Sequence, residues 1–339
     1  MIRMSIKNNL IGIIGFGKMG QIRAHSVESS GKAKVKSVYE EYISEKNISY
    51  TLAENANEVI KDPDIDAVII CTPNYLNKPL TIQALEAGKH VFCEKPPAFN
   101  SNEVEEIIAA EKKSGKKLMY GFNHRHHESI RHMKKMIDSN EYGKLLWMRG
   151  RYGKSVDKTF FDTWRANKEL SGGGILIDQG IHMLDLFIML GGGFDSVQAD
   201  VSSNYWNQEI EDNVFAIYKN STTGVVASLH STMTQWRHLF SLEVFLEEGY
   251  LVLNGLKTSS GTYGDEVLSI AKNRSTAPAA TWKDEEEITY LTDKSWQSEA
   301  DEFISSIKKQ RKVNIGSSAD ALKLMKIIDQ IYAFKKKEK

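Results

Sequence analysis

A glycine-punctuated turn near the N-terminus constrains the fold of this chain more than any other feature. The segment Leu10–His25, LIGIIGFGKMGQIRAH, is an apolar run followed by a G-x-G-x-x-G turn and a helical pattern. Gly15 permits the tight turn, Gly17 leaves room for a pyrophosphate, and Gly20 lets the helix pack closely on the strand. The segment therefore predicts a dinucleotide-binding unit, with the phosphates at the helix N-terminus; a purely structural turn is the alternative. The other residues assigned to cofactor binding by their place in the turn are Phe16, Lys18 and Met19.

Two acidic residues follow the next predicted strand, Lys34–Tyr39. They are Glu40 and Glu41, at about the distance from the glycines at which dinucleotide-binding units carry a ribose-binding acid. A carboxylate there can accept hydrogen bonds from both adenosine ribose hydroxyls and repels the 2′-phosphate of NADP. No Lys or Arg lies between Val38 and Ile43 to pair with that phosphate. We expect NAD, bound by Glu40; Glu41 could take this role instead, or both acids could be solvated loop charges.

The composition is that of an ordinary globular protein. The 339 residues suffice for two domains, and Lys plus Arg and Asp plus Glu both total 44, so charge gives no reason to expect nucleic acid or an anionic membrane as partner. The only two cysteines, Cys71 and Cys93, lie in apolar strand patterns, so no disulfide framework is expected. The first apolar run contains the glycine turn and lacks a cleavage site, and no apolar stretch is expected to span a bilayer. We expect a cytoplasmic protein.

Strand and helix patterns alternate from the glycine turn to about Asn123, which predicts a doubly wound parallel sheet of the Rossmann type. Beyond the first two strands, the expected strands are Ala67–Cys71, His90–Cys93 and Lys117–Gly121, and the expected helices are Ala53–Ile60, Lys78–Gly88 and Ser101–Lys113. Ligands of such sheets bind beyond the carboxyl ends of the strands, so the loops after Cys71, Cys93 and Gly121 are candidate site loops.

The character of the chain changes after a predicted helix at Ser129–Ile137. A strand is expected at Leu145–Tyr152, and from Val197 onward hairpins predict an antiparallel sheet. The hairpin strands are Val214–Lys219 with Val225–Thr232 and Phe240–Leu246 with Tyr250–Leu253, and two helices are expected at Trp296–Lys309 and Ala319–Lys336. We therefore expect an NAD-binding α/β domain at residues 1–128. An α+β domain of mostly antiparallel sheet, covered on one face by helices, should occupy residues 129–339, and the terminal helices could pack back on the first domain.

The site loops of the predicted parallel sheet are rich in polar residues and prolines. Lys95 is the most informative, because a lysine held between a buried strand and two prolines could bind a substrate hydroxyl and stabilise an alkoxide. It is a candidate for cofactor binding, substrate binding and catalysis. The other candidates on these loops are Thr72, Pro73, Asn74 and Glu94 for the cofactor and Arg125 for the substrate.

The chemically densest segment is Ser171–Leu190. Three glycines precede an apolar helical pattern in which Asp178, His182 and Asp185 recur four and three residues apart, so they should share one helix face. Burying unpaired charge is costly, so three ionisable groups in register indicate function more than a lone core histidine would. His182 is the expected general base, because imidazole titrates near neutral pH. Asp178 would orient the base or bind a neighbouring hydroxyl.

Other candidates carry weaker signals. Trp164 and Arg165 precede the glycine run and could form one wall of a substrate pocket. Tyr152 and Lys154 are expected on the surface. No metal site is expected in the histidine-rich segment, because no carboxylate or thiolate stands at matching spacing. Its histidines are His124, His126, His127 and His132.

Five motifs in order, GFGKMG, CTPN, GKHVFCEKP, GFNHR and GGGILIDQGIHMLDL, resemble the Gfo/Idh/MocA family of oxidoreductases, named for glucose-fructose oxidoreductase and inositol dehydrogenase. The resemblance implies that Lys95 contacts substrate and the nicotinamide ribose. It also implies that Asp178 and His182 reach the substrate, whereas Asp185 looks more structural. Asn77 stands where the family often has His, which leaves the role of that position open.

The expected function is reversible NAD-dependent oxidation of a secondary alcohol on a sugar, polyol or nucleotide sugar. His182 would take the hydroxyl proton, Lys95 would bind the same oxygen, and Asp178 would support them. The sequence Gln179–His182 is more similar to family members that oxidise nucleotide-linked sugars than to inositol dehydrogenases. One alternative is an NAD-dependent glycoside hydrolase using nearly the same residues. Another is a non-catalytic NAD-binding sensor or partner protein, against which the pair Lys95 and His182 argues.

The resemblance also implies self-association through the open face of the second sheet, giving a homodimer or homotetramer. An apolar face without enough helices to cover it is expected on two neighbouring strands. Its expected residues are Val214, Ala216, Val225, Ala227 and Leu229.

Overall fold

The computed structural model describes residues 9–42, 48–274, 276–278 and 280–335. These residues form two compact units. The first unit contains the chain up to Asn123 together with Trp296–Leu322, and the second contains His124–Ser295 and the chain from Lys323 onward. The chain thus passes from one unit to the other just before the predicted domain boundary at residues 128 and 129.

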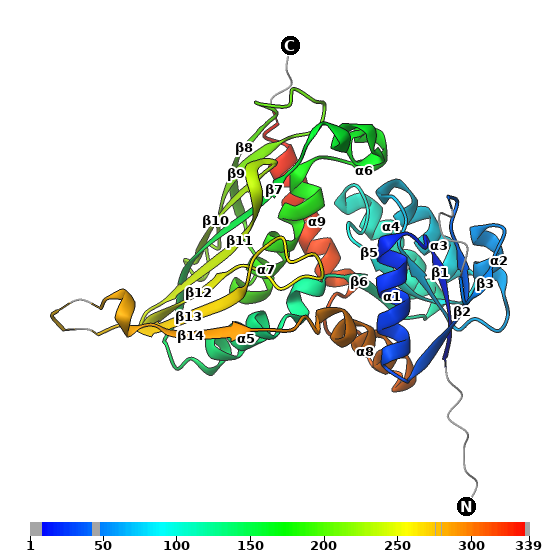
Figure 1. Cartoon of the computed structure of the whole chain (residues 1–339), viewed down its shortest axis with the longest axis horizontal. Helices are drawn as coiled ribbons and strands as arrows, with labels where there is room; N and C mark the ends of the chain where they lie inside the picture. The colour runs from blue at the N-terminus through cyan, green and yellow to red at the C-terminus, as the bar shows by residue number, and fades with distance from the viewer. Residues whose placement is uncertain (1–8, 43–47, 275, 279, 336–339) are drawn as a thin grey trace, which may run out of the picture. The chain divides into compact units, whose positions relative to one another are not determined.

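The first unit is built on a six-stranded sheet in the order β3-β2-β1-β4-β5-β6, and every neighbouring pair of its strands is parallel (Figure 1). This confirms the predicted doubly wound sheet. The strands are β1 Asn9–Ile14, β2 Ala33–Tyr39, β3 Thr51–Leu52, β4 Ala67–Ile70, β5 His90–Glu94 and β6 Leu118–Gly121. The helices are α1 Lys18–Ser29, α2 Ala56–Lys61, α3 Asn77–Glu86, α4 Ser101–Ser114 and α8 Ser295–Lys308, with a short helical turn η1 at Asn74–Leu76.

Continuous apolar strands dictate this architecture. All four residues of β4, AVII, are buried, as expected for a parallel strand covered on both faces. Helix α4 shows how the sequence sets its ends: the Asn100 side chain accepts a hydrogen bond from the Glu103 amide at the N-terminus, and Gly115 takes a left-handed conformation at the C-terminus. Helix α8 joins the core of this unit, where Phe303 meets Phe92 edge to face with ring centroids 5.7 Å apart.

The second unit is built on an eight-stranded sheet in the order β14-β13-β12-β11-β7-β10-β9-β8. Only β7 and β10 pair in parallel; the other neighbours are antiparallel, as predicted. The strands are β7 Leu145–Ser155, β8 Ser196–Ser202, β9 Asn213–Lys219, β10 Val226–Thr232, β11 Thr234–Leu246, β12 Gly249–Asn254, β13 Glu266–Lys272 and β14 Glu286–Tyr290. The helices are α5 Glu128–Ser139, α6 Lys168–Ser171, α7 Ile181–Gly191 and α9 Ser318–Tyr332, with short helical turns at η2 Asn123–His126, η3 Lys158–Asp162, η4 Trp164–Ala166 and η6 Trp282–Asp284 and a π-helical turn η5 at Leu176–Gly180.

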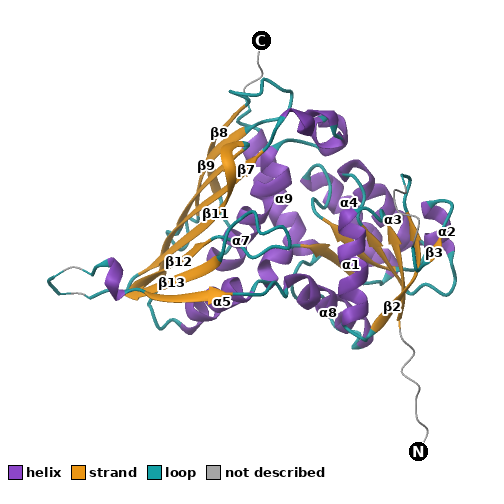
Figure 2. Cartoon of the chain, viewed as in Figure 1, coloured by secondary structure: helices purple, strands orange, loops and turns teal. Residues whose placement is uncertain are grey.

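Helices cover one face of the larger sheet, as Figure 2 shows, and α7 lies on that face. A Cβ added to Gly150 of β7 would lie 2.5 Å from the Met183 side chain of α7, so this glycine lets helix and strand approach closely. The predicted helix-covered antiparallel sheet is confirmed. The strands β13 and β14, which close one end of the sheet, were not predicted.

The residues predicted to form an open apolar face of the larger sheet are wrong. Val214, Ala216, Val225, Ala227 and Leu229 are all buried in this unit and do not form an exposed surface. The side chains of Phe215 and Ile217 on β9 are instead about half exposed, at 51% and 52%. Side chains alternate between the faces of a strand, so choosing the wrong set of alternate residues exchanges the two faces.

By length and composition alone, the helical segment Lys168–Gly191 is long and apolar enough to cross a membrane, contrary to the expectation that no stretch would be. However, 83% of its 18-residue apolar stretch is buried inside the structure. Burial of this kind is typical of a core helix, and α7, the C-terminal part of this segment, lies on the helix-covered face of the larger sheet (Figure 2).

Candidate functional site

The glycine turn between β1 and α1 has the geometry of a phosphate cradle. Gly15 has a φ of +86°, and a Cβ there would lie 2.5 Å from the Cys71 carbonyl oxygen; a Cβ on Gly20 would lie 2.2 Å from the Gly15 carbonyl oxygen. At Gly17 the one atom of the described residues that a Cβ would meet within 4 Å is a carboxylate oxygen of Glu40, at 3.8 Å. Backbone packing thus requires Gly15 and Gly20, whereas Gly17 leaves open space at the N-terminus of α1, where phosphates bind.

The Glu40 carboxylate lies against this turn. Its Oε2 accepts a hydrogen bond of 2.6 Å from the backbone amide of Phe16, and its Oε1 accepts one of 3.3 Å from the amide of Tyr42. Glu41 is exposed. Of the two acids left open by the sequence, Glu40 is therefore the one positioned beside the glycines. Phe16 is buried, Met19 is half-buried and Lys18 is exposed at the start of α1.

A buried asparagine ties together the loops after β4 and β5. Asn77 is fully buried; its Nδ2 donates to the carbonyl oxygens of Glu94, at 3.3 Å, and Pro96, at 2.8 Å, while Thr72 Oγ1 donates to its Oδ1 at 3.3 Å. Lys95 lies between the two carbonyls that Asn77 holds, and its peptide bond to Pro96 is cis. The role left open at position 77 is thus the fixing of the backbone on both sides of Lys95. Pro73 and Asn74 lead from this loop into η1.

The Glu94 carboxylate belongs to a buried ion-pair network. Arg23 donates from Nε to Glu94 at 2.6 Å and from Nη1 to Glu299 at 2.5 Å, and its guanidinium lies 4.3 Å from the Phe92 ring centroid. Burial lowers the pKa of Arg23, but Glu299 and Glu94 more than compensate and hold it above its ordinary value. The network joins α1, β5 and α8, and fixes the end of the strand that carries Lys95. The predicted contact of Glu94 with the cofactor stays a prediction.

Within the second unit, His182 is part of a buried aromatic and polar cluster. Its ring stacks on that of His124 with centroids 3.9 Å apart and an angle of 18° between the planes. His124 Nε2 lies 2.9 Å from the hydroxyl of Tyr152. Burial, the neighbouring Tyr263 and Asp178 raise the pKa of Tyr152 well above its ordinary value, so its hydroxyl stays protonated. The expectation that Tyr152 lies on the surface is wrong, because it is 3% exposed.

Asp178 is half-buried and paired with cations. Its Oδ2 lies 3.1 Å from Lys154 Nζ, and its Oδ1 lies 4.0 Å from Arg165 Nε. Lys154, expected to be a simple surface residue, is a partner of this candidate site. Asp178 lies in the π-helical turn η5, a feature often found at functional sites, whereas His182 and Asp185 lie in the α-helix α7 that follows.

Asp185 has a different role from Asp178. It is fully buried and forms a bidentate ion pair with Arg125, with distances of 2.7 Å from Nε and 2.6 Å from Nη2. This geometry fits the structural role expected for Asp185, because removing one partner would leave the other charge buried. Arg125 is itself 5% exposed, and its predicted contact with substrate stays a prediction.

Trp164 and Arg165 lie together in η4. The Arg165 guanidinium is 4.4 Å from the centroid of the Trp164 ring, and Trp164 lines a pocket of about 560 Å³. Among the residues that the structure describes, no group of three or more His, Cys, Asp or Glu side chains is arranged to hold a metal ion. Two histidines of the histidine-rich segment have separate partners instead: His127 meets Glu266 at 2.9 Å, and His132 meets Tyr290 at 2.8 Å.

Sequence reasoning missed two members of the His182 cluster. His124 was considered only as a metal ligand, and Tyr152 was assigned to the surface. One signal was available for Tyr152: it lies on the same alternating face of its strand as Met148 and Gly150, both of which are buried. No comparable signal exists for His124, whose neighbours are brought to it by tertiary packing.

Two family models match the chain in succession. Residues 10–122 match the NAD-binding Rossmann fold of the Gfo/Idh/MocA oxidoreductase family, and residues 130–252 match the C-terminal domain of that family. Together the matches cover well over half of the 339 residues.

Three individual proteins or structures that resemble this chain share between 24% and 37% of their residues with it over the matched regions. Levoglucosan dehydrogenase of Pseudarthrobacter phenanthrenivorans is 37% identical over 147 residues, which are 43% of this chain and only 38% of that protein. Myo-inositol 2-dehydrogenase of Thermotoga maritima is 26% identical over 269 residues, 76% of this chain and 78% of that protein. A solved structure of levoglucosan dehydrogenase with NADH and levoglucosan has a TM-score of 0.84 over 97% of each chain at 24% identity, which shows a shared fold.

Proposed function

Because the chain belongs to the Gfo/Idh/MocA family of oxidoreductases, we propose that it is an NAD-dependent dehydrogenase that oxidises a secondary alcohol of a sugar, polyol or nucleotide sugar. The observation that carries the proposal is the buried cluster of His182, His124 and Tyr152, because it provides a positioned imidazole in a unit that follows a dinucleotide-binding fold. Relatives named for levoglucosan and myo-inositol support a sugar or polyol as the substrate class.

The first unit would hold the cofactor through its glycine turn. The open space at Gly17 admits the pyrophosphate, and Glu40 would accept hydrogen bonds from the adenosine ribose hydroxyls. A carboxylate at that position opposes a 2′-phosphate, so NAD is proposed over NADP. When bound, the nicotinamide supplies the hydride acceptor.

The second unit would handle the proton. In the proposed reaction His182 accepts the hydroxyl proton at a ring nitrogen. The stacked His124, held by the Tyr152 hydroxyl, fixes the imidazole plane. Asp178, oriented by Lys154, would accept a hydrogen bond from a neighbouring substrate hydroxyl. Lys95 would donate to the reacting oxygen and stabilise its developing negative charge.

A spectrophotometric screen for NADH tests this proposal. Sugars, polyols and UDP-sugars are supplied with NAD and NADP in parallel. Reduction of NAD by at least one sugar or polyol is expected, and the UDP-sugar arm tests the similarity of Gln179–His182 to nucleotide-sugar enzymes. A preference for NADP would refute the role given to Glu40. Release of a leaving group from a glycoside without net NADH would instead support the alternative of an NAD-dependent glycoside hydrolase.

A non-catalytic NAD-binding protein is the other alternative. It predicts NAD binding with no turnover of any substrate in the screen. For an enzyme, Lys95→Ala and His182→Ala should strongly lower turnover without loss of NAD binding, measured by calorimetry. Full turnover in both variants would show that the site assignment is wrong.

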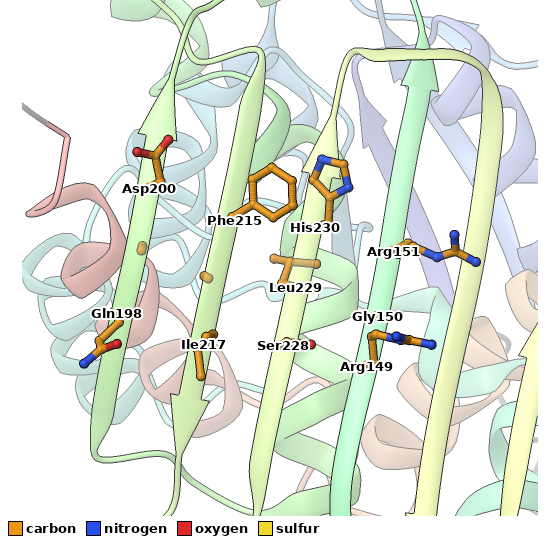
Figure 3. A pocket seen from close by; sticks show the side chains of 12 residues that line it. Arg149, Gly150, Arg151, Gln198, Asp200, Phe215, Ile217, Ser228, Leu229 and His230 are labelled. Atoms are coloured by element: carbon orange, nitrogen blue, oxygen red, sulfur yellow. The ribbon is translucent and has the colours of Figure 1, made fainter.

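We also propose that copies of the chain associate through the outer face of the larger sheet. A shallow pocket of about 540 Å³ lies on this face, and Figure 3 shows that Phe215 and Ile217 on β9, His230 on β10 and Arg151 on β7 line it. No helix covers this face among the described residues (Figure 2). The expected result is a homodimer or homotetramer by light scattering; a monomer at micromolar concentration would contradict it.

A cytoplasmic location is likewise proposed, in keeping with two cysteines that form no disulfide.

A further inference from the structure

A second pocket lies within the second unit, and His182, His124 and Tyr152 are not among its lining residues. Its volume of about 560 Å³ falls within the range of about 300–1,000 Å³ that is typical of small-molecule sites. Aromatic, amide and carboxylate side chains share its lining. The lining residues that the argument uses are Phe161, Trp164, Asn167, Leu170, Gln208 and Glu209.

Two short series of contacts connect this pocket to Asp178. Arg165 lies 4.0 Å from the Asp178 carboxylate, and its guanidinium covers the ring of Trp164, which lines the pocket. Lys154 lies 3.1 Å from the same carboxylate and 5.0 Å from the ring centroid of Phe160, whose chain neighbour also lines the pocket. The lining of the pocket is therefore connected to Asp178 through the side chains of Arg165 and Lys154.

A group of aromatic side chains extends from the pocket to the surface. The ring of Phe161 lies 4.9 Å from that of Trp206, which lies 5.0 Å from Tyr205, which in turn lies 4.9 Å from Trp236. Tyr205 is 56% exposed and Trp236 is 57% exposed. Contiguous exposed aromatic surface of this kind marks a binding site more often than scattered apolar residues do.

The aromatic group is held rigidly. The carboxylate of Asp212, which is 1% exposed, accepts hydrogen bonds from the backbone amides of Asn204, Tyr205 and Trp206 at 3.2, 2.9 and 2.8 Å. Trp236 has a φ of +57°, in the left-handed region that bulky residues rarely adopt, at an irregularity in β11. Strained conformations of this kind cluster at binding sites and active sites.

We propose that this pocket binds the second sugar ring of a glycoside or oligosaccharide whose first ring is oxidised beside Asp178 and His182, an inference that rests on the proposed function. A sugar ring presents an apolar face of C–H groups, which stacks on aromatic rings such as Phe161 and Trp164. It also presents hydroxyls, which pair with exposed amides and carboxylates such as Gln208 and Glu209. Beside the Phe161 ring, the indole N–H of Trp206 is buried without an acceptor among the described residues.

The test compares matched ligands that share one first ring. Methyl β-D-glucoside is paired with cellobiose, and methyl α-D-glucoside with maltose, on the full chain with NAD. One disaccharide should have a kcat/KM about fivefold or more above its methyl glycoside, since a single aromatic contact contributes that much. Gln208→Ala and Phe161→Ala should lower the disaccharide value severalfold more than the methyl glycoside value. Trp282→Ala, which removes an exposed tryptophan outside the pocket, should change neither.

Calorimetric titration of the same ligands separates this inference from the proposed reaction. If no sugar yields NADH but a disaccharide binds the parent and not Gln208→Ala, the pocket assignment stands and the proposed reaction fails. If sugars are oxidised but both ligands of each pair behave alike in parent and variants, the reaction stands and the pocket assignment is overturned. Failure of both disaccharides to bind, or a change of oligomeric mass in Gln208→Ala, would also overturn it.

Discussion

The two halves of the candidate site are determined in different ways. In the first unit the cofactor half depends on backbone packing: a Cβ on Gly20 would lie 2.2 Å from a carbonyl oxygen, so the chain itself shapes the cradle. In the second unit the substrate half depends on side chains from separate elements, with His182 stacked on His124 and His124 held by Tyr152. Constraints on the backbone leave a local mark in the sequence, whereas a side-chain cluster assembled by tertiary packing leaves almost none.

The largest effect should come from His182, because the substrate half concentrates its chemistry in one side chain. His182→Ala should lower kcat by about a thousandfold, within the range for loss of a general base, and leave NAD affinity unchanged. The measurements are steady-state NADH formation and calorimetric titration with NAD. His230→Ala is the matched control, since His230 also stacks on an aromatic ring, Phe215, at 3.9 Å in the same unit. Equal losses in the two variants would contradict the assignment.

In the cofactor half, by contrast, a substitution should lower NAD affinity. Gly17→Ala adds a methyl group that, among the described residues, meets only Glu40 within 4 Å, at 3.8 Å, so the melting temperature should hardly change. The methyl group would occupy the space proposed for the pyrophosphate, so NAD affinity should fall roughly a hundredfold, or about 2.7 kcal/mol. Calorimetry and thermal unfolding measure the two effects. Gly193→Ala, which meets nothing within 4 Å, is the control; unchanged NAD affinity in Gly17→Ala would show that the turn is only structural.

The difference between the halves also explains what could be predicted from sequence. The parallel sheet, the glycine turn and the position of Glu40 follow from local patterns of apolar residues, glycines and one acid. The face of β9 was assigned wrongly because both sets of alternate residues are apolar: Val214 and Ala216 are buried, and Phe215 and Ile217 are exposed. Where both sets are apolar, alternation cannot distinguish the covered face from the open one.

The substrate half was predicted only in part for a related reason. The spacing of one helix face does hold for Asp178, His182 and Asp185. However, Asp178 lies in a π-helical turn, and Asp185 forms an ion pair with the buried Arg125. The spacing of ionisable residues identified the right segment, yet their partners lie far away in sequence. Such partners determine whether an acid is a site residue or a structural one, and spacing contains no information about them.

Asn77 combines the two kinds of constraint, since a buried side chain here fixes the position of the backbone. Asn77→Ala should leave the carbonyls of Glu94 and Pro96 without their buried donor and cost about 1–3 kcal/mol of unfolding free energy. Because Lys95 lies between these carbonyls, kcat should also fall while NAD affinity holds. Denaturant unfolding and steady-state kinetics measure the two effects. Asn57→Ala, which removes only an exposed hydrogen bond to Gln83 in the same unit, is the control and should change stability by less than about 0.5 kcal/mol.

Replacement by histidine separates positioning from stability at this residue. Asn77→His supplies a ring N–H to donate to one of the two carbonyls, and histidine is the residue that the family resemblance leads us to expect at this position. If Asn77 acts through Lys95, this variant should recover kcat more fully than it recovers the free energy of unfolding. Parallel recovery of the two quantities would indicate that Asn77 contributes only to stability.

The smallest effect should arise at Glu40, where a side chain selects between two cofactors that share the same cradle. Glu40→Ser removes the charge opposing a 2′-phosphate but leaves a hydroxyl for the ribose, so the ratio of kcat/KM for NAD over NADP should fall about tenfold, or about 1.4 kcal/mol. The amide of Phe16 would lose its acceptor at 2.6 Å, so some weakening with NAD is expected as well. Glu41→Ser is the matched control, because its carboxylate is exposed and Glu40 is the acid that contacts the turn. An equal shift of cofactor preference in Glu41→Ser would show that both acids act on the ribose. The role of a side chain beside the glycine turn would then be as hard to predict from sequence as the cluster around His182.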